Sequence, residues 1–293
     1  MTGATIGAGR MRWVPAVGLT PDEPDRVAAP QIIDSWLLDD SRVRGLSRHE
    51  ARFADGCDSL VSGPTSESVH HFLAAVRAAL PRRGVWFPRL EADRSEHQLA
   101  LWLRPAPPLR TSTALWVPEA PDPRRCPTVK GPDLAVLAGL RRQANLAGAD
   151  DALLYLADGT VLETAHAALL WWRGPVLCLP DQQLPTLASV TVGLLVELAH
   201  HQGVTVRYER CHLAELVELP VWTANALHGL RRVSQWTGHR DLTSDQTAPG
   251  PPLNQWRTAL QTTAAPLPDP ANQTKPHVSS LDAPDPPSTP GAA

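Results

Sequence analysis

Lys130 is the residue whose type points most clearly to chemistry. The 293 residues include 27 Lys and Arg, and only Lys130 and Lys275 among them are lysines. Lys275 lies in a proline-rich C-terminal stretch, so Lys130 is the only lysine of the part that we expect to fold. Arginine replaces lysine as a surface cation, but it cannot be deprotonated to a nucleophilic amine. The retained lysine therefore indicates either a task that needs a primary amine, foremost Schiff-base formation with a carbonyl compound, or chance.

The segment around Lys130 has a defined local structure. Four prolines among charged residues make 118–127 a linker, which predicts a domain boundary there. Gly131-Pro132-Asp133 predicts the start of a helix that ends near Gly148. The lysine thus lies between a proline-rich linker and a packed helix.

Glu163 follows 33 residues later, on the return strand of a predicted hairpin. Strands are expected over 152–156 and 160–163, joined by an Asp158-Gly159 turn. A helix and a hairpin between Lys130 and Glu163 can bring both side chains to one site. Alone, a glutamate on such a strand is more often a solvated residue.

A second hairpin, over 167–172 and 175–179, precedes a helix from Ser189 to Gly203. Ser189, Val190 and Thr191 at its start offer free backbone N–H groups and two hydroxyls to a phosphate. The alternative is an ordinary serine N-cap. A strand (204–208), a short helix (212–216) and a strand (220–223) then lead to Asn225.

The N-terminal half is predicted to form strands and helices of a separate domain. A Ser47–Glu50 capping box predicts the start of the first helix. The expected elements are a strand over 31–39, helices over 47–60 and 66–80, and strands over 84–90, 98–104 and 112–117. We expect four parts: a loose N-terminal arm (1–30), a smaller α/β domain (31–120), a C-terminal domain (121–245) and a Pro-rich, mostly disordered tail (246–293), with a short helix over 255–260.

Composition excludes several classes of protein. The formal net charge of −3 and the absence of a dense Lys/Arg run argue against nucleic-acid binding. No stretch approaches 18 uninterrupted apolar residues, and no secretory signal is visible, so we expect a cytoplasmic protein without membrane contact. The His200-His201 and Cys211-His212 pairs lack metal-ligand spacing, and we expect no metal site.

Taken together, residues 130–238 resemble the class IV aminotransferases, the pyridoxal-phosphate enzymes of fold type IV. This family includes branched-chain and D-amino-acid aminotransferases and aminodeoxychorismate lyase. The matching pieces, in order, are Lys130-Gly131-Pro132-Asp133, GADDALLYLADGTVLETAHAALLWW, LASVTVGLLVELA and VWTANALHGLRRV. Upstream, DSWLLDDSRVRGLSRHEARF is similar to the family's first-domain strand, turn and helix.

The resemblance implies a two-domain α+β fold with pyridoxal 5′-phosphate bound between the domains. Lys130 would form the Schiff base and move a proton during the reaction, and Glu163 would hold the pyridine nitrogen. The phosphate would lie against five residues: Ser189, Val190, Thr191, Asn225 and Ala226. Because relatives are commonly homodimers, the resemblance also implies a homodimer.

The leading functional prediction is transamination between an amino acid and a 2-oxo acid. Asn225-Ala226-Leu227 is closest to the lyase form, so aminodeoxychorismate lyase, which forms 4-aminobenzoate by pyruvate elimination, stays open as an alternative. A member with altered or lost activity is a further alternative, since the family's Tyr-Gly motif is not found. Relatives place substrate-carboxylate arginines near the 105–108 proline turn; the substrate candidates are Arg104, Arg110, His166 and His228.

Overall fold

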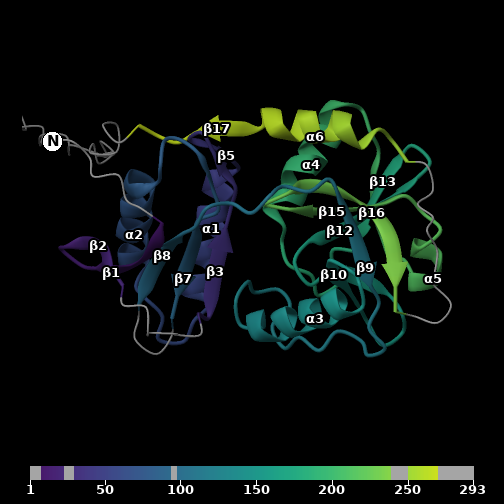
Figure 1. The fold of residues 1–293 in the computed structure, drawn as a ribbon, viewed down its shortest axis with the longest axis horizontal. Coiled ribbons are helices and arrows are strands. Elements are labelled where there is room, and N and C mark those ends of the chain that lie inside the picture. Colours follow the sequence, from purple (N-terminus) through teal and green to yellow (C-terminus); the bar gives the residue numbers. More distant parts are fainter. Residues whose placement is uncertain (1–7, 23–29, 94–97, 239–249, 270–293) are drawn as a thin grey trace, which may run out of the picture.

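The computed structural model describes residues 8–22, 30–93, 98–238 and 250–269. These residues form two lobes of mixed helix and sheet, which lie side by side in Figure 1. The predicted two-domain α+β fold is confirmed.

The smaller lobe contains an antiparallel sheet of five strands. In sheet order its strands are β2 (Gly18–Pro21), β1 (Gly9–Val14), β8 (Leu99–Leu103), β7 (Arg89–Ala92) and β3 (Ile32–Ser35). Helices α1 (Leu46–Asp58) and α2 (Ser66–Ala79) bury Phe53 and Phe72 against this sheet. The two rings pack at 6.0 Å between centroids in an apolar core.

A second, smaller antiparallel sheet joins residues 264–266 to the smaller lobe. Its order is β17 (Ala264–Pro266), β5 (Arg42–Arg44), β4 (Leu38–Asp39) and β6 (Val85–Trp86). Helix α6 (Leu253–Thr262) lies on the larger lobe, and β17 continues from it to β5 on the smaller one (Figure 1).

The larger lobe is built on a mixed sheet of eight strands. In sheet order these are β11 (Val161–Thr164), β10 (Asp151–Tyr155), β9 (Ser112–Trp116), β16 (Gly229–Thr237), β15 (Val221–Asn225), β12 (Ala168–Arg173), β13 (Val176–Pro180) and β14 (Val206–Glu209). A short helix, α5 (Leu213–Leu216), follows β14.

Two helices of the larger lobe connect parallel strand pairs, and their first turns matter for the site. Helix α3 (Leu134–Leu146) links β9 to β10, and α4 (Val190–His201) links β13 to β14. Three indole rings, of Trp172, Trp222 and Trp256, pack edge to face and fasten α6 to this sheet.

Several sequence-based expectations for the N-terminal part are corrected. The expected loose arm contains the paired strands β1 and β2. The Ser47–Glu50 capping box does not form, because α1 begins at Leu46 with Gly45 as its N-cap at φ 64°. Glu50 instead forms an ion pair with Arg77 of α2 at 2.9 Å.

The C-terminal part also differs from expectation. β9, expected in the first domain, pairs with β10 and β16, so it belongs to the larger lobe. β16 was not expected as a strand. The short helix expected over 255–260 lies within α6, which is longer than expected, and β17 follows it where a disordered tail was expected. The expected disorder beyond residue 269 lies outside the described residues.

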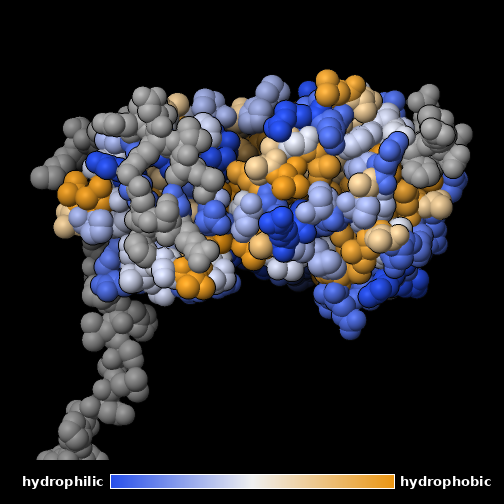
Figure 2. Space-filling model, turned by 90° about the horizontal axis from the view of Figure 1, so that it is seen from below, coloured by the Kyte–Doolittle hydropathy of each residue, from blue (hydrophilic) through white to orange (hydrophobic). Residues whose placement is uncertain are grey.

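No helix within the described ranges is long and apolar enough to cross a membrane. On the face shown in Figure 2, hydrophobic residues gather near the middle of the molecule, and hydrophilic residues dominate the outer end of the larger lobe.

Candidate active site

A cavity of about 720 Å³ is lined by residues of both lobes. Every site residue predicted from the sequence lines this cavity: Lys130, Glu163, Ser189, Val190, Thr191, Asn225, Ala226, Arg104, Arg110, His166 and His228. Its volume is in the range typical of small-molecule and cofactor sites.

Lys130 is held at the junction of the lobes by its own backbone. Its carbonyl oxygen accepts a hydrogen bond from the N–H of Ile33, on β3, at 2.8 Å. Gly131 has φ 147°, and a Cβ atom there would lie 2.2 Å from the carbonyl oxygen of Gln31. Only glycine therefore allows this approach of the two chains.

The loop before α3 is closed by Asp133, the N-cap of that helix. The Asp133 carboxylate accepts hydrogen bonds from the backbone N–H groups of Arg125, at 3.1 Å, and Cys126, at 2.8 Å. The helix start expected at Gly131-Pro132-Asp133 is thus confirmed, but the carboxylate fixes the loop that carries Lys130 rather than capping α3.

Burial lowers the pKa of Lys130 below its ordinary value, and the positive charge of Arg52 lowers it further. The carboxylates of Asp34 and Glu163 act in the opposite direction without reversing the shift. A lowered pKa raises the fraction of neutral amine, which is the nucleophilic form.

A buried network from the smaller lobe lies beside Lys130. Asp34, on β3, accepts from His49 Nδ1 at 2.8 Å and is held in bidentate fashion by Arg52 at 2.8 and 2.9 Å. Burial alone would raise the pKa of Asp34, but the His49 hydrogen bond and the Arg52 charge lower it to about 2. Burial lowers the pKa of His49, so its imidazole is neutral near pH 7.

Glu163 is 6% exposed and is oriented by a side-chain donor and a backbone donor. Its Oε1 atom accepts hydrogen bonds from Arg124 Nη1 at 2.7 Å and from the N–H of Leu187 at 3.0 Å. Arg124 also pairs with Asp122 at 2.8 Å. Oε2 of Glu163 accepts no hydrogen bond from the described residues, so one oxygen of a fixed carboxylate is free for a ligand.

The first turn of α4 lines the cavity beside this network. Ser189 is its N-cap, and the Ser189 Oγ atom accepts from the N–H of Val192 at 3.3 Å. Among the described residues, no acceptor binds the N–H groups of Val190 and Thr191. Arg52 Nη1 donates to the carbonyl of Ala188 at 2.8 Å, which brings a guanidinium to the end of the helix that attracts anions.

The turn between β15 and β16 closes another side of the cavity. Asn225 Oδ1 accepts from the N–H of His228 at 2.8 Å, and Asn225 Nδ2 donates to the carbonyl of His166 at 3.3 Å. The carbonyl of Ala226 accepts from Arg44 Nη2 at 3.0 Å. The Asn225 side chain therefore shapes this turn and links it to the segment of His166 between β11 and β12.

His166 and His228 differ in environment. His166 Nδ1 lies 3.3 Å from Oδ1 of the buried Asp151. Burial and the nearby arginines Arg231, Arg110 and Arg141 lower the pKa of His228 to about 4, so this histidine is neutral. Its Nδ1 atom accepts from the N–H of Arg110 at 3.3 Å.

The two arginines that flank the proline turn, Arg104 and Arg110, also differ in their partners. Arg110 forms an ion pair with Asp150 at 2.6 Å. Arg104 has no carboxylate partner within the described ranges and stacks on Phe87 and Trp102, with its Cζ atom 5.0 and 4.9 Å from the ring centroids. Burial lowers the pKa of Arg104 to about 10.

Sequence reasoning did not select Asp34, His49, Arg52, Arg124 or Arg231 as site residues, although all but Asp34 line the cavity. One signal was available: Asp34 interrupts the apolar run Ile32–Leu38, and a carboxylate inside a buried strand needs a cationic partner. The arginines carried no local signal that distinguished them.

The fold is that of the fold type IV aminotransferases. A PLP-bound structure described as a hypothetical aminotransferase from Mycobacterium tuberculosis is 17% identical, with a TM-score of 0.70 over 87% of this chain and 98% of that one. The Escherichia coli branched-chain amino acid aminotransferase is 15% identical, with a TM-score of 0.70 over 87% of this chain and 93% of that one. A fold IV transaminase of Curtobacterium pusillum is 15% identical, with a TM-score of 0.67 over 87% and 98%.

Residues 31–236 match the family model described as Amino-transferase class IV, and the chain belongs to that family. No curated protein matches the sequence. The resemblance inferred from four short segments is confirmed.

Proposed function

We propose that this protein is a pyridoxal-phosphate-dependent aminotransferase that acts on an amino acid and a 2-oxo acid. The observation that carries the proposal is that one cavity is lined by Lys130, by the buried carboxylate of Glu163 and by the first turn of α4. An amine, a carboxylate and a helix N-terminus are the three groups that this cofactor's aldehyde, ring nitrogen and phosphate require.

The residues present fit the cofactor. Glu163 has one oxygen without a partner among the described residues, which suits a protonated pyridine nitrogen. The backbone N–H groups of Val190 and Thr191 suit a phosphate, and Thr191 adds a hydroxyl. When bound, pyridoxal phosphate supplies a ring that accepts electrons from the substrate's α-carbon.

The protein's part in the reaction then follows from its own groups. The fraction of Lys130 with a neutral Nζ atom grows as pH rises. In this form Nζ attacks a carbonyl, and it afterwards accepts and donates a proton. Glu163 keeps a negative charge where a positive ring nitrogen would lie. Arg52, fixed by Asp34, adds positive charge beside the α4 N-terminus.

The structural relatives support the substrate class. The structures of the Mycobacterium tuberculosis protein include one described as bound to α-ketoglutarate and PMP. A further branched-chain amino acid aminotransferase, 16% identical with a TM-score of 0.69, is described in complex with N-(5′-phosphopyridoxyl)-L-glutamate.

Absorbance spectra test the proposal directly. Wild-type protein mixed with pyridoxal phosphate should develop a visible band that Lys130→Ala lacks. Lys275→Ala, which removes the other lysine, is the matched control and should keep the band. Oxo-acid formation from amino acid/2-oxo acid pairs then tests transamination. A wild-type protein that shows no visible band would refute the proposal.

Aminodeoxychorismate lyase is a second candidate, favoured by the Asn225-Ala226-Leu227 turn. Pyruvate release from aminodeoxychorismate, in the absence of any 2-oxo acid acceptor, would identify it. A visible band without either reaction would indicate a family member with altered activity.

We also propose that the protein is a homodimer. Val85, Trp102 and Leu109 are exposed hydrophobic residues, at 46%, 36% and 45%, on segments next to the proline turn that lines the cavity. A second copy covering them would remove apolar surface from water. Size-exclusion chromatography with light-scattering detection measures the molar mass and tests this proposal. The molar mass of a single chain at micromolar concentration would contradict it.

A further inference from the structure

The arginines that line the cavity fall into two groups. Four have carboxylate partners: Arg52 with Asp34, Arg89 with Glu91, Arg110 with Asp150, and Arg124 with Asp122 and Glu163. Three have none among the described residues: Arg104, Arg141 and Arg231. Arg141 is exposed to water, which can solvate its charge, whereas Arg104 is partly buried and Arg231 is 6% exposed.

Arg231 is the most unusual of these cations. It lies on β16 opposite Thr223 of β15, and its guanidinium makes no hydrogen bond or ion pair within the described ranges. The nearest opposing charges are already engaged. Asp150 binds Arg110 and the N–H of Ala114, and Asp151 binds Thr164 at 2.8 Å and His166.

The surroundings of Arg231 add positive charge. Arg110 and Arg141 oppose its charged form, as burial does, and the net effect lowers its pKa although Asp150 and Asp151 act against it. A buried cation that lacks a partner destabilises a protein by several kcal/mol unless it is compensated. An anion entering the cavity would supply the missing partner.

Arg104 approaches the same cavity from the other lobe. It follows β8, and its Nε atom donates to the carbonyl of Phe87 at 3.2 Å, so its position is fixed by the smaller lobe. Arg231 is fixed by the sheet of the larger lobe. The cavity thus presents two cations without carboxylate partners, on different lobes, and a ligand with two separate anionic groups would satisfy both.

We propose that Arg231 is a specificity-determining residue of the cavity: it binds one carboxylate of the ligand while Arg104 binds another, so that acids with two carboxylates are preferred to acids with one. This inference rests on the proposed function for the identity of these acids as amino and 2-oxo acid substrates. The binding of two carboxylates is independent of it.

Unreactive acids of matched length test the binding. Full-length protein is titrated calorimetrically with succinate, glutarate and adipate, and with butyrate, valerate and hexanoate. At least one dicarboxylate should bind on the order of tenfold more tightly than its monocarboxylate, because it adds a charge-assisted interaction in a desolvated site. Arg231→Met should remove this preference. Arg231→Lys should keep part of it, since it keeps the charge but not the planar fork.

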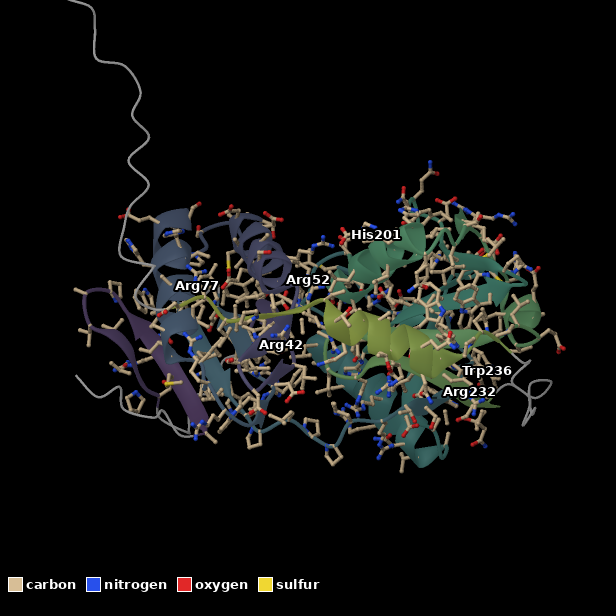
Figure 3. The ribbon with its side chains drawn as sticks, turned by 90° about the horizontal axis from the view of Figure 1, so that it is seen from above. Arg42, Arg52, Arg77, His201, Arg232 and Trp236 are labelled. Atoms are coloured by element: carbon tan, nitrogen blue, oxygen red, sulfur yellow. The ribbon has the colours of Figure 1, made fainter. Side chains whose placement is uncertain are left out.

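Arg232→Met is the matched control. It removes the same charge from the next residue of the same strand, but Arg232 is exposed, does not line the cavity and lies at the outer side of the larger lobe (Figure 3). It should leave the dicarboxylate preference unchanged. Equal binding of mono- and dicarboxylates by wild type would overturn the inference, as would an equal loss of both in Arg231→Met.

Two further readouts separate this role from a structural one. Without ligand, Arg231→Met should have the wild-type melting temperature or a higher one, because it removes an uncompensated buried charge; a marked fall would assign Arg231 to the fold and overturn the inference. The visible band with pyridoxal phosphate should persist in Arg231→Met. If wild type lacks that band but still prefers dicarboxylates, the proposed function fails and the two-carboxylate site stands.

Discussion

Arg124 Nη1 lies 2.7 Å from Oε1 of Glu163, and both side chains are almost completely buried. Burial raises the pKa of Glu163, while Arg124 and the N–H of Leu187 oppose that shift. Arg124 is fixed in turn by Asp122. Residues of the larger lobe therefore hold the Glu163 carboxylate in place through Oε1. A ligand needs to supply a partner only for Oε2.

Glu163→Gln should lower the turnover number by about two orders of magnitude, because an amide keeps the size of the side chain but cannot keep a ring nitrogen protonated. Steady-state kinetics with saturating cofactor measure the effect. Glu197→Gln is the control, since Glu197 pairs with Arg48 on the surface at 2.6 Å. Wild-type turnover in Glu163→Gln would remove this residue from the mechanism.

Gly131→Ala should destabilise the protein by about 3 kcal/mol or more, because its Cβ atom would collide with backbone at a φ that disfavours side chains. Urea unfolding measures the loss. Gly139→Ala is the control: it lies inside α3, where its Cβ would meet only the Arg142 side chain at 3.7 Å. That substitution should be neutral or stabilise the helix by about 0.5–1 kcal/mol. Similar effects for both would contradict the close approach at Gly131.

Acid should destabilise the fold through Asp34. Its folded pKa of about 2 lies below the ordinary 3.8, so its contribution is complete above pH 3.8 and is lost as pH falls towards 2. The loss amounts to about 2 kcal/mol. His49, whose folded pKa lies below 6.5, loses its contribution as pH falls below that value. Unfolding free energies at stepped pH should show both declines in wild type. In Asp34→Asn the lower decline should be smaller by about 2 kcal/mol, the remainder coming from carboxylates such as Asp151 and Glu209 whose pKa values are also lowered. Asp55→Asn, an exposed change in α1, should keep both.

Arg52→Met should move the reactivity of Lys130 to higher pH, by on the order of one pH unit. Arg52 lowers the pKa of Lys130 by its charge, and its removal also leaves Asp34 without its guanidinium partner, which raises that pKa further. The measurement is the pH midpoint for the visible band formed with pyridoxal, which lacks the phosphate. Arg48→Met serves as the control, and an unchanged midpoint in Arg52→Met would contradict the assigned electrostatics.

The parts of the site that sequence analysis anticipated are those with local signatures. Lys130 stood out by residue type, Glu163 by a hairpin, and Ser189 by a helix start. Their meeting at one cavity follows from the two parallel crossovers through α3 and α4. The first of these was not anticipated, because β9 was expected in the other domain.

The remaining site residues are set by contacts distant in sequence. Arg124 and Glu163 are 39 residues apart, and Arg52 and Ala188 are 136 apart. Nothing local distinguishes these arginines from the others in an arginine-rich chain. β16 escaped prediction because a register irregularity between Val233 and Gln235 interrupts its alternation, and its pairing with β9 is parallel and remote.

The crossing of the chain by α6 and β17 has a consequence for how the molecule can be divided. Since β17 supplies an edge strand to the smaller lobe, a protein divided between β8 and β9 would expose the backbone of β5 and leave the larger fragment with a strand that has no sheet. The chain passes from the smaller to the larger lobe between β8 and β9 and returns between α6 and β17, so the distance across the mouth of the cavity depends on an intact polypeptide.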